Sequence, residues 1–205
     1  MKRPIAALAV ALTLATATAG PASAQDKPIG VSYQPSLYWA LPFHYANVKG
    51  WWKEVGLAPN FTTFPAGAPQ IAAAPSKSWD VGGTGSVPAV LGAVRFNILT
   101  IGISNDESKT NAMMVRGDKF DAIKANPSAL KGQKLLLTTN STVDYASRKC
   151  LLKMGLALND MQFVNLGQAQ IITAITSNNG DVAGVCAPNT YTLEERANAR
   201  YLCSG

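Results

Sequence analysis

Residues that favour strands and residues that favour helices alternate along the first half of the chain. Runs rich in β-branched and other apolar residues predict strands at residues 27–33, 60–65, 79–85 and 96–104. Apolar positions spaced three and four residues apart predict helical segments at residues 37–56, 68–75 and 86–94. Strands that alternate with helices at this spacing are typical of a parallel sheet covered by helices.

The alternation begins again after a polar stretch at residues 104–111. Strands are predicted at residues 112–116, 132–139, 161–166 and 181–187. Helices are predicted at residues 143–156 and 167–180, and a helix or loop at residues 119–130. Two α/β units joined by a polar stretch imply two lobes with a hinge and a cleft between them. We therefore expect lobe 1 at residues 25–105 and lobe 2 at residues 106–205.

The first 24 residues have the pattern of a cleavable export signal. Lys2 and Arg3 precede an apolar run at residues 5–14, and residues 22–24 fit an A-x-A cleavage site. A retained membrane anchor is the alternative, but the run is shorter than the roughly 20 apolar residues that span a bilayer. The residue directly after the site is Gln25, so no cysteine is placed there to carry a lipid. We expect export to a periplasm, with cleavage after Ala24.

Composition narrows the class of protein. The chain has 205 residues, 47% of them hydrophobic, and a formal charge of +6 that includes the two basic residues of the export signal. A chain of this length and composition can bury one ordinary core or two small ones. Its basic residues are spread thinly, without the runs that nucleic-acid binding requires. We expect a globular monomer with no nucleic-acid partner.

Three cysteines allow at most one intramolecular disulfide. Cys186 and Cys203 both lie in short strand-like runs that could be neighbours in a sheet, so a bridge between them is one possibility. Sequence alone does not place two Cα atoms within the roughly 4.4 to 6.8 Å that a disulfide requires. Cys150 lies in a helical pattern, and we expect it to be a small buried apolar side chain.

Glycines and hydroxyl side chains come directly before the predicted helix at residues 86–94. In the stretch VGGTGS at residues 81–86, the glycines let the backbone approach a ligand, and Thr84 or Ser86 can cap the next helix. The free N–H groups and the positive dipole end of such a helix form a ready anion site. A capped helix that binds no ligand is the other interpretation of this stretch.

The stretch TTNSTVDYA at residues 138–146 repeats this arrangement in the second unit. An apolar strand is followed by Asn140, Ser141 and Thr142, which could cap the next helix or bind a ligand. In open parallel sheets, ligands bind beyond the carboxyl ends of the strands, where loops lead into helices. The two corners could therefore converge on one small ligand.

Four segments in order give the chain a resemblance to a known family. They read YWALPFHYANVKGWWKEVGL, WDVGGTGSVPAVLGAV, LKGQKLLLTTNSTVDYASRKCLLKMGL and GDVAGVCAPNTYTLEE. Their landmarks are G-(aromatic)-(aromatic)-K-x-x-GL after a first helix, a strand D-x-G-x-x-G-x-x-P-A, an opening similar to L-K-G-K, and an acidic residue before a strand that ends in x-P. Over residues 29–205 they resemble the nitrate/sulfonate/taurine family of ABC-transporter substrate-binding proteins.

The resemblance implies an α/β fold of the two-lobe periplasmic-binding-protein type II, with parallel or mixed sheets flanked by helices. It also implies that a ligand is held between the lobes and that the closed form is delivered to an ABC permease in the inner membrane. Such proteins usually continue for roughly another hundred residues that return to lobe 1. We expect this second crossing to be missing here, as in a fragment or in a protein with an exposed sheet edge.

The resemblance further implies that ligand contacts lie where strands end. The candidates are Tyr33, Gln34 and Trp39 after the first strand, Thr84, Gly85 and Ser86 after the third, Asn140, Ser141 and Thr142 in the second lobe, and Pro188 and Asn189 after the last clear strand. Tyr33 and Trp39 could instead pack under the first helix, because large aromatic side chains are usually part of a core.

The expected ligand is a small anion such as an aliphatic sulfonate, taurine or nitrate, because two helix N-termini would face it. Tyr33 and Trp39 could equally stack on a flat ring, as in the branch of the family that binds a thiamine-precursor pyrimidine. The wider superfamily includes a pyrimidine-synthesising enzyme, but its histidine- and cysteine-rich signature is absent, and the chain has one histidine. We expect a binding protein that needs no cofactor or metal and has no enzymatic activity.

Overall fold

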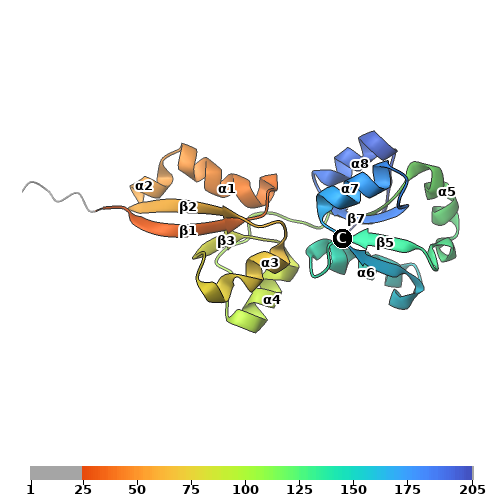
Figure 1. Ribbon diagram of the computed structural model, residues 1–205, viewed down its shortest axis with the longest axis horizontal. Coiled ribbons are helices and arrows are strands. Elements are labelled where there is room, and N and C mark those ends of the chain that lie inside the picture. Colours follow the sequence, from red (N-terminus) through yellow and green to blue (C-terminus); the bar gives the residue numbers. More distant parts are fainter. Residues whose placement is uncertain (1–24, 205) are drawn as a thin grey trace, which may run out of the picture.

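The computed structural model describes residues 25–204, so the predicted export signal at residues 1–24 lies outside the described part of the chain. The elements gather around two separate sheets that lie side by side and are joined by an extended segment (Figure 1). We keep the names lobe 1 and lobe 2 for the parts around the first and the second sheet. None of the helices within the described range is long and apolar enough to cross a membrane.

Lobe 1 is built on a parallel three-stranded sheet with the order β2-β1-β3. Its elements are β1 (Lys27–Tyr33), α1 (Leu37–Val48), α2 (Trp51–Glu54), β2 (Leu57–Thr63), α3 (Gly67–Ala72), the 3-10 turn η1 (Ala74–Ser76), β3 (Val81–Gly83) and α4 (Ser86–Phe96). Because all three strands are parallel, their carboxyl ends meet at one edge of the sheet, which places the turn between β3 and α4 beside the end of β1.

Lobe 2 is built on a mixed five-stranded sheet with the order β6-β5-β7-β4-β8, in which β4 runs antiparallel to β7 and β8. Its elements are β4 (Asn111–Val115), α5 (Gly117–Ala125), η2 (Pro127–Leu130), β5 (Lys134–Leu137), α6 (Thr142–Lys153), η3 (Leu158–Asp160), β6 (Gln162–Asn165), α7 (Gln168–Thr176), β7 (Val182–Cys186), α8 (Asn189–Ala197) and β8 (Arg200–Ser204). The predicted α/β class with parallel and mixed sheets is confirmed.

Both faces of the lobe 2 sheet are buried. Met113 and Leu135 pack with Leu151 of α6 on one face, whereas the next residue along β4, Met114, packs with Ile171 of α7 on the other. Successive strand residues point to opposite faces, so a strand covered on both sides must be apolar throughout. This explains why these segments are continuous apolar runs in the sequence.

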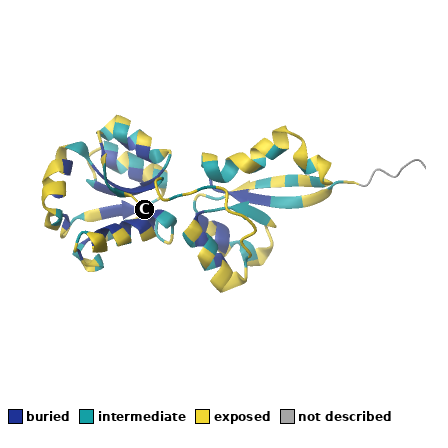
Figure 2. Cartoon of the chain, turned by 180° about the vertical axis from the view of Figure 1, so that it is seen from behind, coloured by how far each residue is buried: buried dark blue, intermediate teal, exposed yellow. Residues whose placement is uncertain are grey.

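Lobe 1 buries far fewer apolar side chains than lobe 2. Its buried large apolar side chains are Val31, Tyr33 and Ile71, and α1 has no buried residue although most of its residues are apolar. Figure 2 shows the same contrast, with buried positions concentrated in lobe 2 and exposed positions along the helices of lobe 1. Hydrophobic stabilisation scales with the apolar area removed from water, so it is far smaller for lobe 1.

The predicted strand at residues 96–104 is wrong. Residue 96 ends α4, and residues 98–103 form no ladder with any strand of the described chain. Leu99, Ile101 and Ile103 are between 82% and 91% exposed. Apolar composition indicates compatibility with a strand, but a strand also needs a neighbour for its N–H and C=O groups, and no strand adjoins this segment. The other predicted strands and helices are present, with ends shifted by a few residues.

The possible bridge between Cys186 and Cys203 does not form. Cys150 is buried in a helix as expected, but it is not a free side chain: it forms a disulfide with Cys203, with their Cα atoms 6.0 Å apart, and Cys186 is a free buried thiol. Cys186 lies on β7 and Cys203 on β8, and β4 lies between them. Two strands separated by a third are roughly 9 to 10 Å apart, which is too far for a disulfide. Cys150 reaches β8 because α6 packs across that part of the sheet.

Candidate functional site

The turn from β3 into α4 brings the backbone of lobe 1 to the boundary between the lobes. Gly85 is the N-cap residue of α4, so the N-cap position supplies no side-chain hydrogen bond, and neither Thr84 nor Ser86 supplies one in its place. The expectation that Thr84 or Ser86 caps it is therefore wrong. The amide of Ser86 instead donates a hydrogen bond to the carboxylate Oε2 of Glu107, at 3.1 Å. A carboxylate from the segment between the lobes thus satisfies one of the free N–H groups at this helix start.

Two buried amide side chains form hydrogen bonds with the turn between β3 and α4. Gln34 is 4% exposed and Gln70 is 1% exposed. The Gln34 amide group donates to the side-chain oxygen of Gln70 and, at 3.2 Å, to the hydroxyl of Thr84. The Gln70 amide group donates to the Ser32 hydroxyl at 2.7 Å and to the Gly83 carbonyl at 3.3 Å. Gln34 and Thr84, two of the predicted ligand contacts, are thus joined in a network that holds the turn.

Only glycine fits at two positions of this turn. A Cβ atom added to Gly83 would lie 2.5 Å from the backbone oxygen of Trp39, and one added to Gly85 would lie 2.5 Å from Oγ1 of Thr142. The Gly85 position is also 3.5 Å from Cζ2 of Trp39. The absence of side chains therefore lets α1 and the start of α6 approach the turn, whereas the glycine pattern was interpreted as room for a ligand.

The start of α6 is the counterpart in lobe 2. Ser141 is the N-cap residue: its hydroxyl accepts from the amide of Asp144 at 3.2 Å and donates to the carbonyl of Thr138 at 2.6 Å. Asn140 is exposed, and its backbone N–H donates to the Asp144 carboxylate at 3.0 Å. Thr142 faces lobe 1, and its hydroxyl lies 3.4 Å from that of Ser86. Of the three predicted residues in this corner, Thr142 is the one that makes contact across the boundary.

A second contact between the lobes involves Tyr38 of α1. Its hydroxyl donates to the carbonyl of Ala187 at 2.9 Å. Burial raises the pKa of Tyr38 above its ordinary value, and the nearby Cys186 thiol and Glu107 carboxylate act in the same direction. Burial likewise raises the pKa of Cys186, so both groups hold their protons at neutral pH.

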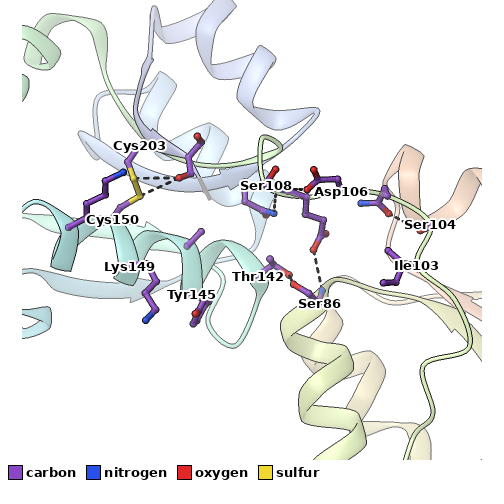
Figure 3. A pocket seen from close by; sticks show the side chains of 16 residues that line it. Ser86, Ile103, Ser104, Asp106, Ser108, Thr142, Tyr145, Lys149, Cys150 and Cys203 are labelled. Atoms are coloured by element: carbon purple, nitrogen blue, oxygen red, sulfur yellow. Dashed lines mark hydrogen bonds between the residues drawn. A yellow bond between two sulfur atoms is a disulfide. The ribbon is translucent and has the colours of Figure 1, made fainter.

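A cavity of about 810 Å³ opens beside these contacts (Figure 3). Ser86 and Thr142 line it where the lobes meet, and the Cys150–Cys203 disulfide lines its other end. The segment that joins the lobes contributes Glu107. This volume is within the range of small-molecule sites, which lie between about 300 and 1,000 Å³.

The contacts of Tyr33 and Asn189 stay within one lobe. The Tyr33 hydroxyl is 2.8 Å from Nε2 of His44, and its ring packs against His44 and Phe61 within lobe 1. Asn189 donates to the side-chain oxygen of Gln168 at 3.2 Å, and Pro188 is exposed beside it. The structure thus brings Trp39, Thr84, Gly85, Ser86 and Thr142 together but not Tyr33.

Sequence reasoning missed several residues at this boundary. Glu107 lies in the polar stretch that was interpreted only as a hinge. Tyr38 was overlooked beside Trp39, and Gln70 and Gln168 were taken as ordinary helix residues. Gln70 did carry a signal, because it is the one polar side chain in the run APQIAAAP. Buried polar groups need partners, so such a residue indicates a polar network.

Comparisons with known proteins agree with this architecture. The family model described as NMT1/THI5 like matches residues 39–202. A protein of Brucella abortus (strain 2308), named "Putative binding protein", is 27% identical over 198 residues, which are 95% of this chain and 58% of the relative. The chain therefore spans less than two thirds of the length of the curated relatives that it matches.

Solved structures share the fold at low identity. The alkanesulfonate-binding protein SsuA from Xanthomonas axonopodis pv. citri, bound to MOPS, is similar with a TM-score of 0.76 and 21% identity, over 89% of this chain and 62% of that chain. The periplasmic nitrate-binding protein NrtA from Synechocystis PCC 6803 is similar with a TM-score of 0.64 and 13% identity, over 87% and 51% of the two chains. These similarities establish the fold of the chain as that of periplasmic binding proteins.

Proposed function

The chain belongs to the NMT1/THI5-like family, and from this premise we propose that it is the periplasmic solute-binding component of an ABC importer. It takes a small anion such as an aliphatic sulfonate, taurine or nitrate in the cleft between its lobes and presents the closed form to a permease in the inner membrane. Export with cleavage after Ala24 and a monomeric state belong to the same proposal. Structural similarity to sulfonate- and nitrate-binding proteins supports this ligand class.

The observation that carries the proposal is the approach of two helix starts across the lobe boundary. The Ser86 and Thr142 hydroxyls lie 3.4 Å apart at the starts of α4 and α6, and the cavity opens beside them. The first N–H groups of any helix have no partner within the helix, and the helix dipole makes this end positive. At α6, the amides of Thr142 and Val143 and the Thr142 hydroxyl can receive the anionic group of a ligand.

Closure of the lobes would couple binding to transport. Two hydrogen-bonding contacts join the lobes near the cavity, Ser86 with Thr142 and Tyr38 with Ala187. A ligand that touches both sides binds the closed arrangement more tightly and shifts the equilibrium towards it. The pyrimidine alternative receives less support, because Tyr33, one of the two rings expected to stack on it, packs against His44 and Phe61.

Isothermal titration calorimetry of the purified chain tests the proposal. The titrants are ethanesulfonate, taurine, nitrate and hydroxymethylpyrimidine, and chromatography of the recovered ligand checks that it is returned unchanged. We expect saturable binding of at least one of the three anions. Absence of binding of all three, or binding of the pyrimidine alone, would contradict the proposal.

A matched pair of variants places the anion. Thr142→Val removes the hydroxyl at the start of α6 and keeps the shape of the side chain. It should weaken binding about tenfold or more, because a hydrogen bond to a charged group is worth about 1.5 to 3 kcal/mol. Thr173→Val is the control, because Thr173 is exposed on α7 and its hydroxyl bonds only to a carbonyl of its own helix. Equal affinities of the two variants would remove Thr142 from the site.

A further inference from the structure

Glu107 places a fixed negative charge at the start of α4, where an anionic ligand was expected to bind. Its Oε2 atom accepts from the Ser86 amide at 3.1 Å. Its own carbonyl is held by the Thr110 amide and by the Asn111 side chain, both at 3.1 Å. Glu107 is therefore held at its backbone carbonyl and at one carboxylate oxygen, and the α4 start already has its anion.

The second carboxylate oxygen of Glu107 has no partner. Oε1 is buried, and no donor in the described part of the chain reaches it. Glu107 also takes part in none of the ion pairs found among residues 25–204. A buried charged oxygen without a hydrogen bond is costly, so a donor brought by a ligand would gain more here than at a solvated carboxylate.

Among residues 25–204, no lysine, arginine or histidine nitrogen lies within 4.0 Å of the Glu107 carboxylate. The groups that sense its charge are Tyr38 and Cys186, which are neutral and whose pKa values it helps to raise. Lys149 and Lys153 line the same cavity, but they lie seven and eleven residues beyond Thr142 on α6. At the usual rise per residue these positions are roughly 10 and 16 Å along the helix. A simple anion beside Glu107 would meet an unscreened like charge.

We propose that Glu107 is a specificity-determining residue that selects ligands with a protonated amine next to their anionic group, such as an amino-substituted sulfonate or carboxylate, over simple anions. This inference rests on the proposed function, because it concerns the ligand of the same cleft. The amine donates to Oε1 of Glu107, while the anionic group binds at the start of α6. Glu107 thus divides the cleft into a cation-binding side on lobe 1 and an anion-binding side on lobe 2.

The distances fit a ligand of this size. The position of a Cβ atom built on Gly85 is 2.5 Å from Oγ1 of Thr142 and 3.5 Å from Oε1 of Glu107. The two oxygen atoms can therefore be no farther apart than the sum of these distances. An amine and an anionic group joined by two methylene groups are separated by roughly 4 to 5 Å. Such a ligand can approach Thr142 with one end and Glu107 with the other.

Calorimetric titration with two ligands of one skeleton tests the inference. The ligands are taurine, which is 2-aminoethanesulfonate, and ethanesulfonate, and they differ in the amine alone. We expect the unmodified chain to bind the amino compound at least thirtyfold more tightly, and Glu107→Gln to reduce this preference to threefold or less. The side-chain oxygen of the glutamine can still accept from the Ser86 amide, so the turn should keep its shape. A thermal melt of each variant checks folding.

Glu195→Gln is the matched control. Glu195 is an exposed carboxylate on α8 that does not line the cavity, so its neutralisation should leave the preference unchanged. Equal affinity of the unmodified chain for both sulfonates would overturn the inference, and this measurement needs no variant. The inference would also be overturned if Glu107→Gln kept the preference unchanged, or if it lowered the affinity for both ligands by the same factor. Each of these results leaves anion binding intact, whereas failure of every anion to bind would refute the proposed function and this inference with it.

Discussion

Reduction of the Cys150–Cys203 disulfide should lower the free energy of unfolding of lobe 2 by about 4 kcal/mol. The two cysteines are separated by 53 residues, and the loop between them contains most of the lobe 2 sheet. Closing a loop of this length removes conformational entropy from the unfolded chain, which gives the stated magnitude at 25 °C. With a typical urea m-value of about 2 kcal/mol/M, the midpoint of unfolding should fall by about 2 M.

The distribution of tryptophan provides the assay. All four tryptophans, Trp39, Trp51, Trp52 and Trp79, lie in lobe 1. Tryptophan fluorescence therefore reports the unfolding of lobe 1, and far-ultraviolet circular dichroism reports both lobes. Addition of a phosphine reductant should move the circular-dichroism transition and leave the fluorescence transition in place.

Two cysteine variants serve as controls for this experiment. The double variant Cys150→Ala/Cys203→Ala should not respond to the reductant, whereas Cys186→Ala should respond as the unmodified chain does, because Cys186 is free. If the reductant moved neither transition, the loop-entropy argument would be wrong. If it moved both equally, the assignment of the effect to lobe 2 would be wrong.

Three further changes test the packing around the cleft. Gln70→Leu removes the hydrogen bonds that Gln70 makes with the buried side chains of Gln34 and Ser32 and should cost about 1 to 3 kcal/mol of lobe 1 stability by tryptophan fluorescence; an unchanged midpoint would show that the network does not hold the turn. Gly85→Ala places a Cβ atom 2.5 Å from the Thr142 hydroxyl, so calorimetry should show weaker ligand binding while the lobe 1 transition stays within about 1 kcal/mol; tighter or equal binding would argue against this closure contact. Because burial raises the pKa of the Cys186 thiol, the thiol stays protonated and should react with a disulfide reagent at pH 8 only after unfolding; rapid labelling of the native chain would contradict its buried position.

Local sequence pattern predicted most of the secondary structure. The strand at residues 27–33 has the predicted bounds, and α4 begins at Ser86 as expected. A run of strand-forming residues and the helical spacing of apolar residues both depend on residues close together in the sequence, so strands and helices can be predicted from them. The wrongly predicted strand at residues 96–104 had the same local properties. It differs because no strand adjoins it, and sequence pattern carries no information about available neighbours.

The site was harder to predict than the fold because it depends on contacts between distant residues. The glycine pattern at residues 82–85 was interpreted as room for a ligand, and it did not indicate that Trp39 and Thr142 approach the turn. Glu107 was overlooked because a single glutamate in a polar stretch looks like any solvated loop residue. Its meeting with Ser86 follows from the path of the segment between the lobes. The disulfide was mispredicted for a related reason, since strand order decides which cysteines can meet.

The position of Glu107 gives one side chain a mechanical task. Its backbone carbonyl accepts from Thr110 and from Asn111, the first residue of β4 in lobe 2, whereas its carboxylate accepts from the Ser86 amide at the start of α4 in lobe 1. Glu107 therefore links the two lobes by hydrogen bonds. When one lobe rotates, either the other lobe must rotate with it or the hydrogen bond to Ser86 must break. A ligand amine that competes for this carboxylate would change the stiffness of the joint as well as fill the cleft. Ligand binding in the cleft would then change the relative motion of the two lobes, and a partner that contacts their outer surfaces would detect this change.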